Sequence, residues 1–202
     1  MITIIDYGAG NVKSVQNMLK KIGIESISTH SIKEIENATK LILPGVGAFD
    51  YGMKNLASTG IIETLNKKVI QEKTPILGIC LGAQMLGRKS EEGVEKGLGW
   101  IDMDVKIFNL DDSSLKVPHM NWSNTTPHKK SKLFDDMFED PRFYFVHSYF
   151  MSPNNPEDVL CTVDYGGDFV AAVEKDNIYG VQFHPEKSHK FGMKLLENFY
   201  NI

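Results

Sequence analysis

The 202-residue chain has few cysteines, no excess of positive charge and no long hydrophobic run. Two cysteines do not make a disulfide framework. A net charge of −4 gives no basic field for nucleic acid and no cationic face for a membrane. No apolar run approaches the roughly 18 residues that a spanning helix needs, and the opening stretch MITIIDYGAG does not resemble a signal peptide. We therefore expect a cytoplasmic protein whose thiols are free.

The first 90 residues predict alternating strands and helices. Short apolar, β-branched runs indicate strands at residues 2–5, 24–29, 40–47 and 74–79. Apolar residues recur at helical spacing between these runs, at residues 11–22, 31–38 and 61–69. This rhythm favours right-handed crossovers, and hence an open, mostly parallel sheet flanked by helices.

After about residue 90 the pattern changes to mostly strands. We expect them at residues 101–109, 142–147, 159–165, 169–174 and 178–183. The last two would form a hairpin that turns at Asp176 and Asn177, and a closing amphipathic helix would contain Phe191 and Phe199. Because no linker or repeat interrupts the chain, we expect a single α/β domain over residues 1–202, with an antiparallel strand addition in its C-terminal half.

One of the two cysteines, Cys80, stands between glycines in the stretch GICLG, residues 78–82. This is the G-x-nucleophile-x-G form of a nucleophile elbow, a tight strand-to-helix turn. Side chains two residues on either side of the nucleophile would collide across the turn, and glycine at both positions, 78 and 82, avoids the collision. A helix at 81–89 would direct its N-terminus at the sulfur and favour the thiolate. The alternative interpretation is a buried structural cysteine, which is how we interpret Cys161.

A proton partner for the thiol stands in the stretch QFHPE, residues 182–186. Pro185 biases His184 towards an extended backbone. In an extended chain residues i and i+2 face the same side, so Glu186 can turn back to the imidazole. A carboxylate that orients a histidine serving a thiol is the general logic of a catalytic triad. The alternative is a surface loop with a capping acid before the last helix.

The stretch LILPGVGAF, residues 41–49, places Gly45 and Gly47 around Val46 just after a strand. Backbone N–H groups in such a loop could bind an anion, although a simple tight turn has the same sequence. The loop would lie at the C-terminal edge of the sheet, where open parallel sheets hold their sites.

Together these motifs resemble the class I, or triad, glutamine amidotransferases. Within them, the resemblance is to the glutaminase subunits of imidazole glycerol phosphate synthases, and it spans residues 1–202. Six motifs occur in the same order as in these subunits: DYGAGN, LPGVGAF, GICLGAQML, PHMNW, FVHSY and GVQFHPEKS. The resemblance implies hydrolysis of L-glutamine to glutamate and ammonia, with neither a cofactor nor a metal.

The resemblance also assigns roles to residues. Cys80 would be the nucleophile, His184 its base and then acid, and Glu186 the orienting carboxylate. The oxyanion hole would be formed by the N–H groups of Val46 and Leu81. The glutamine pocket would be lined by Gly47, Gln84, His147, Ser148 and Tyr149.

The resemblance further implies a partner, because the chain has the size of the glutaminase fold alone and contains no domain that would use the ammonia. In the family this partner is a (β/α)8-barrel cyclase subunit, so we expect a heterodimer and no contact with nucleic acid or membrane. The partner interface would include Asn11, His119, Trp122 and Lys187.

One departure from the family pattern lies in the presumed partner surface. The family has Gly-Trp-Asn after Pro-His-Met, whereas this chain has Asn121-Trp122-Ser123. The change keeps open a related ammonia-supplying subunit for amino- or amidino-sugar synthesis in surface polysaccharide. Two other classes are a stand-alone γ-glutamyl cysteine hydrolase and a non-catalytic binding module. Gln84 and the partner-side motifs argue against the hydrolase, and the occupied triad positions argue against the binding module.

Overall fold

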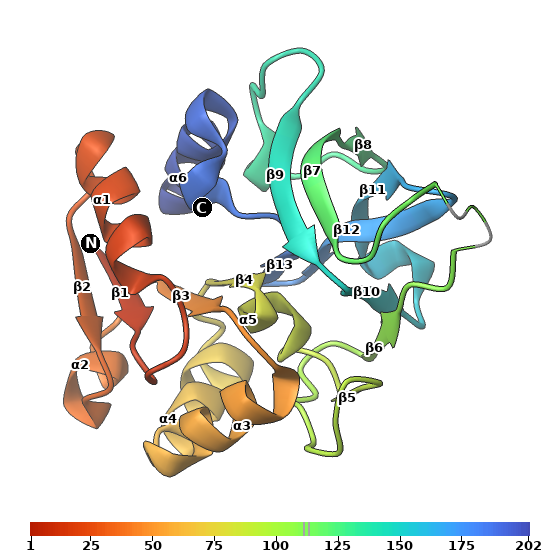
Figure 1. Cartoon of the computed structure of the whole chain (residues 1–202). Helices are drawn as coiled ribbons and strands as arrows, with labels where there is room; N and C mark the ends of the chain where they lie inside the picture. Colours follow the sequence, from red (N-terminus) through yellow and green to blue (C-terminus); the bar gives the residue numbers. More distant parts are fainter. Residues whose placement is uncertain (111, 113) are drawn as a thin grey trace.

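The computed structural model describes residues 1–110, 112 and 114–202. Within this part of the chain, most strands join one 11-stranded sheet, and two more form a separate antiparallel pair. Figure 1 shows the N-terminal elements on one side of the molecule and the C-terminal strands on the other. No helix among the described residues combines the length and hydrophobicity needed to cross a membrane.

The parallel part of the sheet is built mainly from the first 80 residues, as the sequence predicts. Its strands, in spatial order, are β2 (Ser26–Thr29), β1 (Ile2–Ile5), β3 (Leu41–Gly45), β4 (Ile76–Cys80) and β13 (Ile178–Val181). β1, β3, β4 and β13 are buried along their whole length. A central strand with both faces covered requires apolar residues at every position, which explains their continuous hydrophobic runs.

Helices cover both faces of this sheet (Figure 1). They are α1 (Val12–Lys21), α2 (Ile32–Glu36), α3 (Phe49–Ser58), α4 (Ile62–Asn66), α5 (Leu81–Gln84) and α6 (His189–Asn201). A π-helical turn, Lys67–Gln71, continues α4. α1 and α6 contribute to one hydrophobic cluster, and α3 and α4 contribute to the other, on the opposite face.

The second half of the chain extends the sheet with antiparallel strands. These are β12 (Asp168–Lys175), β10 (Tyr149–Pro153), β6 (Met103–Ile107), β11 (Val159–Asp164) and the short strand β8 (Thr126–Pro127). The short strand β5 (Lys89–Ser90) pairs with β6 in parallel at the end of the sheet. The separate pair consists of β7 (His119–Asn124) and β9 (Arg142–His147). The predicted hairpin joins β12 to β13, with Lys175 opposite Ile178 and a φ of +54° at Asp176.

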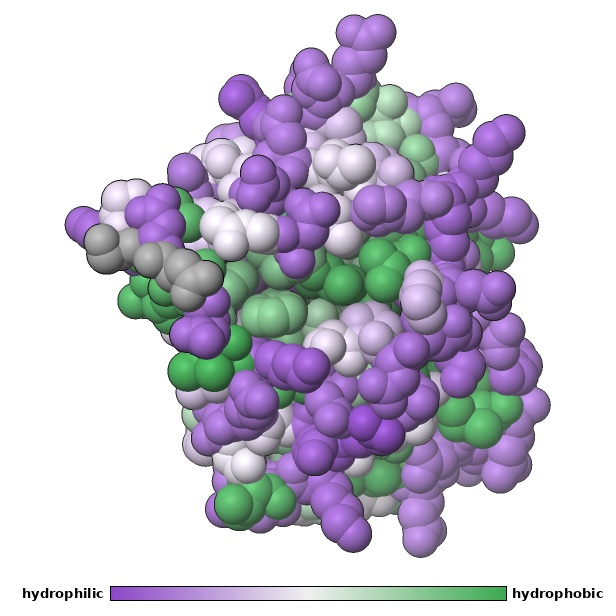
Figure 2. Space-filling model, turned by 90° about the vertical axis from the view of Figure 1, so that its right-hand side faces the viewer, coloured by the Kyte–Doolittle hydropathy of each residue, from purple (hydrophilic) through white to green (hydrophobic). Residues whose placement is uncertain are grey.

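The antiparallel half presents a mainly polar surface. Figure 2 views the molecule from the side of β6, β10, β11 and β12, and most of this face is hydrophilic. Apolar side chains gather in the middle of the face and beside the grey atoms (Figure 2). Phe143, Phe145 and Phe169 are buried within this half.

Several elements differ from the sequence-based prediction. Helix α3 is not predicted, because Gly52 stands in it and interrupts the apolar pattern. A Cβ at Gly52 would lie 2.9 Å from Leu81 Cδ2, so glycine allows α3 to approach the turn after β4. Strands β5, β7, β8 and β10 are also not predicted, and β6 is shorter than the expected strand at 101–109. Two-residue strands and polar strands such as β7 carry little hydrophobic periodicity.

The register of the central strands brings the predicted motifs to one edge of the sheet. Gly45, the last residue of β3, lies opposite Cys80, the last residue of β4. On the other side of β4, Val181 of β13 lies opposite Ile79. The three chain segments that follow these strands therefore leave the sheet side by side at its C-terminal edge.

Candidate active site

Cys80 has a backbone conformation that residues other than glycine rarely adopt. Its φ is +53° and its ψ is −113°, a combination that stores strain. A Cβ at Gly78 would lie 2.7 Å from Ala83 Cα, across the turn, as predicted. A Cβ at Gly82 would instead overlap the carbonyl oxygen of Leu43 in the neighbouring strand β3. The predicted elbow is present, and its two glycines serve different contacts.

The helix that follows Cys80 is shorter than predicted. α5 spans only Leu81–Gln84, whereas the sequence indicated a helix over 81–89. Beyond α5 the backbone forms tight turns, in which the N–H of Leu86 donates to the carbonyl of Ala83. The predicted length is therefore wrong, although a helix does begin directly after Cys80.

His184 and Glu186 make the predicted contact. His184 is extended, with φ −102° and ψ +95°, as the following Pro185 favours. Its Nδ1 lies 2.8 Å from Glu186 Oε1, and both side chains are 2% exposed. Glu186 Oε2 is buried and has no hydrogen-bond partner among the described residues. The His184 imidazole is therefore the hydrogen-bond partner of this buried carboxylate.

The position of His184 between Cys80 and Glu186 sets its protonation state. Burial by itself lowers the pKa of His184, since it penalises the imidazolium. The nearby Cys80 sulfur and Glu186, whose Oε1 lies 2.8 Å from His184 Nδ1, outweigh the burial and raise the pKa of His184 to about 10. A pKa raised in this way favours the imidazolium form of His184 at neutral pH.

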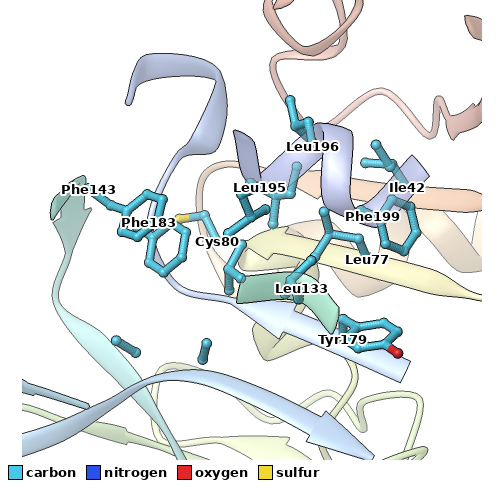
Figure 3. Close-up of a cluster of buried hydrophobic side chains, with 14 of the residues drawn as sticks. Ile42, Leu77, Cys80, Leu133, Phe143, Tyr179, Phe183, Leu195, Leu196 and Phe199 are labelled. Carbon is cyan, nitrogen blue, oxygen red and sulfur yellow. The ribbon is translucent and has the colours of Figure 1, made fainter. Parts of the chain in front are cut away.

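The sulfur lies at the boundary between the hydrophobic core and a cavity. Figure 3 shows Cys80 with its sulfur pointing towards the rings of Phe143 and Phe183, while Leu77 and Leu195 lie deeper in the same cluster. Cys80 is 8% exposed and lines the cavity at this edge of the sheet. The other cysteine, Cys161, is fully buried in β11, and burial raises its thiol pKa, so it is a core residue as predicted.

A cavity of about 440 Å³ opens at this edge of the sheet, a size typical of a site for a small metabolite. Ten residues with predicted roles line it: Val46, Gly47, Cys80, Leu81, Gln84, His147, Ser148, Tyr149, His184 and Lys187. Among the described residues, no group of three His, Cys, Asp or Glu side chains is placed to hold a metal ion.

Glu92, which the sequence did not predict to be a site residue, also lines the cavity. Its Oε2 accepts a hydrogen bond of 2.8 Å from the N–H of Phe49, at the start of α3. Asp50 holds the same loop, because its carboxylate accepts hydrogen bonds from the N–H groups of Val94 and Glu95. These bonds, that from Glu95 first, lower the pKa of Asp50. In the sequence Glu92 looks like any solvated carboxylate of a charged loop. Only these long-range hydrogen bonds, which form in the folded chain, place it at the cavity.

Gln84 is buried and joined to a second glutamine that the sequence analysis did not single out. Gln84 Nε2 donates to the carbonyl of Tyr149 at 3.1 Å and to Gln182 Oε1 at 3.0 Å. Gln182 is fully buried, and its Nε2 donates to Cys80 Sγ at 3.7 Å. The amide of Gln84 thus forms part of the cavity wall and is connected to the sulfur.

His147 is paired with His119, which the sequence analysis placed at a partner interface. The two rings meet at 3.1 Å, from His119 Nδ1 to His147 Nε2, where β7 pairs with β9. The side chain of His119 is 0% exposed. The prediction that His119 contacts a partner is therefore wrong for its side chain, because β9 and the aromatic core cover it.

The other predicted interface residues are accessible. Trp122 is half-buried and stacks on the exposed His189, with ring centroids 5.4 Å apart. Lys187 is exposed at the cavity, and its Nζ lies 5.6 Å from the centroid of the Tyr144 ring. Asn11 is half-buried at the start of α1, where its side chain makes no capping hydrogen bond.

Comparison with known sequences finds matches along the whole chain. The model of the family "Glutamine amidotransferase class-I" matches residues 3–202. A protein of Pseudomonas aeruginosa named imidazole glycerol phosphate synthase subunit HisH 2 is 52% identical over 202 residues, covering all of both chains. A protein of the same name from Methanococcus maripaludis is 57% identical over 199 residues, covering 98% of each chain.

Comparison with solved structures supports the same fold. A structure described as a glutamine amidotransferase has a TM-score of 0.74 at 19% identity, covering 100% of this chain and 98% of that one. PurLQS from Thermotoga maritima has a TM-score of 0.73 at 21% identity, covering 99% and 97%. The expected amidotransferase-like fold, a mostly parallel sheet with an antiparallel addition, is confirmed.

Proposed function

Because the chain belongs to the class I glutamine amidotransferase family, we propose that it is the glutaminase subunit of an imidazole glycerol phosphate synthase, which hydrolyses L-glutamine and passes the ammonia to a (β/α)8-barrel cyclase in histidine biosynthesis. The observation that carries the proposal is the strained Cys80 in the wall of one cavity with His184, which the buried Glu186 side chain orients. The names of the relatives, which describe subunits of that synthase, support the partner.

In the first half of the reaction, the Cys80 thiolate attacks the side-chain amide carbon of glutamine. The N–H groups of Val46 and Leu81, which both line the cavity, would hold the oxyanion that forms. The His184 imidazolium gives its proton to the amide nitrogen, the C–N bond breaks, and ammonia leaves. The product bound to Cys80 is a thioester.

In the second half, His184 is neutral and takes a proton from water, which attacks the thioester carbon. The C–S bond breaks, glutamate leaves, and the imidazolium–thiolate pair is restored. Glu186 holds the imidazole in the required tautomer and stabilises its charge. On the cavity wall, the carboxylate of Glu92 is placed to bind the α-ammonium group of glutamine.

The test is glutamate formation by the purified chain, alone and with the barrel cyclase. We expect turnover that rises with the cyclase and its substrate, and no turnover in Cys80→Ala. The cyclase reaction should continue in Cys80→Ala when ammonium is added, since the barrel only needs the ammonia. A chain that hydrolyses glutamine rapidly alone and does not respond to the cyclase would overturn the subunit proposal in favour of a stand-alone hydrolase.

A second ammonia acceptor has support from one feature, the Asn121-Trp122-Ser123 stretch at the presumed partner surface. An amino- or amidino-sugar synthase would accept the same ammonia. If Cys80 turns over glutamine but the histidine-pathway cyclase neither binds nor stimulates the chain, a sugar-modifying synthase becomes the preferred partner.

A further inference from the structure

A line of hydrogen bonds joins the strand β7 to the Cys80 sulfur through the interior of the chain. We propose that Gln182 is a positioning residue for the Cys80 thiolate, and that this line of hydrogen bonds fixes the orientation of the Gln182 amide. The line is called the β7 relay and consists of Ser123, His119, His147, the Tyr149 carbonyl, Gln84 and Gln182. The inference rests on the proposed role of Cys80 as the nucleophile. It adds a function to residues that are far apart in the sequence and have no role in the proton transfers.

Gln182 presents an N–H donor to the sulfur. Its Nε2 lies 3.7 Å from Cys80 Sγ, within the range of an N–H···S hydrogen bond, and its side chain is fully buried. A donor to a negatively charged sulfur stabilises the charge, whereas an amide oxygen in the same place would repel it. The amide can turn by 180° with little change in shape, so its orientation has to be determined by its other partner.

That partner is Gln84. Gln84 Nε2 has two hydrogens, of which one goes to the carbonyl of Tyr149 and the other to Gln182 Oε1. A carbonyl oxygen only accepts hydrogen bonds, so the contact with Tyr149 fixes which end of the Gln84 amide is the donor. If the Gln182 amide turned, two NH₂ groups would face each other in a buried site. The Tyr149 carbonyl therefore indirectly holds the Gln182 N–H on the sulfur.

His147 holds the Tyr149 carbonyl, and His119 holds His147. His147 Nδ1 lies 2.8 Å from this oxygen, and Nδ1 must be the protonated nitrogen. In a neutral His147, Nε2 is then an acceptor, and it accepts from His119 Nδ1 at 3.1 Å. His119 Nε2 in turn accepts from Ser123 Oγ at 3.0 Å. One tautomer for each ring satisfies every contact.

The relay requires both rings to be neutral, and their surroundings provide this. Burial, the largest influence on both, lowers the pKa of His147 to about 3 and that of His119 to about 4. A proton on His147 Nε2 would face the N–H of His119. Ser123 is half-buried on β7 and ends the relay beside Trp122, one of the predicted interface residues. The relay thus reaches from the thiolate to the presumed partner side.

The first test examines Gln182 through the reaction of Cys80 with iodoacetamide, which does not depend on glutamine. In a Cys161→Ala background Cys80 is the only thiol. At pH 7 we expect Gln182→Met, which removes the donor, to react about 10-fold more slowly, and Gln182→Glu, which also places a carboxylate beside the sulfur, about 100-fold more slowly. Rates within twofold of the parent for folded variants would overturn the positioning role. If Gln182→Glu does not fold, Gln182→Met decides the question.

The second test examines the far end of the relay. Ser123→Ala removes the hydroxyl, Ser123→Thr keeps it, and Ser152→Ala is a matched control on β10 outside the relay. We expect Ser123→Ala to lower kcat for glutamine about threefold with KM unchanged and to slow the alkylation of Cys80 similarly. Ser123→Thr and Ser152→Ala should keep the parent values. Equal kcat and alkylation rates in all three variants would remove Ser123 and the histidines from the proposal.

The two readouts separate failure of the inference from failure of the proposed function. Slower alkylation in the Gln182 variants, with no glutamine turnover by the parent, would support the relay and reject the glutaminase. Glutamine turnover by the parent, with unchanged alkylation in the variants, would support the glutaminase and reject the relay.

Discussion

The two halves of the molecule determine their parts of the site in different ways. In the parallel half, the position of Cys80 depends on the backbone: a positive φ, and glycines where any side chain would collide. After β13 and in the antiparallel half, the site depends on side-chain hydrogen bonds, namely the bond that His184 donates to Glu186 and the bonds of the β7 relay. We therefore expect that substitutions which add a side chain around Cys80 displace the nucleophile. Substitutions in the hydrogen-bonded side chains should instead remove one hydrogen bond at a time.

This difference explains which residues of the site can be predicted from the sequence. The glycine spacing around Cys80 is local, so it indicates the elbow directly. His184 and Glu186 are also local to each other, and Pro185 sets the extended backbone between them. Side-chain networks between distant strands leave no such local pattern.

The largest effect should come from the carboxylate of the triad. Glu186→Gln keeps the shape of the side chain but removes the charge, and we expect kcat for glutamine to fall by about 10³–10⁴-fold. The substitution should also lower the pKa of His184 from its value of about 10. Initial rates with saturating glutamine measure the first effect, and a fall of less than tenfold would contradict the triad.

The raised pKa of His184 also has a consequence for stability. A histidine with a raised pKa contributes stability that is fully present below its unfolded pKa of about 6.5 and is lost as pH rises through its folded pKa. Urea unfolding between pH 6 and 10 should show this loss in the parent. In Glu186→Gln the loss should be smaller and should be complete at lower pH, because the folded pKa of His184 is lower. An unchanged profile would contradict the assigned charge.

The next effect tests the backbone half. Gly82→Ala would place a methyl group on the Leu43 carbonyl oxygen, which should cost about 3 kcal/mol of unfolding free energy and lower kcat about 100-fold by displacing the nucleophile. Gly60→Ala is the control, because its Cβ would meet no atom within 4 Å, although its φ of +72° costs about 1 kcal/mol. A folded Gly82→Ala with parent kcat would show that the elbow tolerates movement.

A pH-dependent effect, in acid, tests the buried histidine pair. The pKa values of His147 and His119 are lowered, to about 3 and about 4, chiefly by burial. Their stability contribution is therefore present above pH 6.5 and is lost as pH falls towards these values, by about 1.4 kcal/mol per pH unit for each ring. Urea unfolding at pH 7, 6 and 5 measures the slope. His119→Gln should reduce it, and an equal slope in the variant would contradict a neutral pair.

The smallest effect concerns the second thiol. Cys161→Ala removes a sulfur atom from the core of β11 and should cost about 1–2 kcal/mol of unfolding free energy. Glutamine turnover should not change, because Cys161 is fully buried and does not line the cavity. Thermal unfolding and initial rates check both statements, and a loss of kcat would give Cys161 a role that its position does not explain.

Much of the fold and of the triad is predictable because the signals are local. The continuous hydrophobic runs of β1, β3 and β4 come from burial on both faces, and the α6 pattern comes from burial on one. Glu92 and Gln182 are not predictable in the same way. Glu92 stands in a charged loop that Asp50 holds only in the folded chain. Gln182 stands beside an apolar strand, and its partner Gln84 is about one hundred residues earlier.

The most direct test of the central claim is the covalent labelling of Cys80 by a chloroketone analogue of glutamine, followed by intact mass and peptide mapping. We expect one adduct per chain, at Cys80, which forms more slowly in excess L-glutamine and does not form in Cys80→Ala. Labelling of Cys80 that L-glutamine does not slow, or no labelling of the folded chain, would contradict a glutamine site built around this thiol.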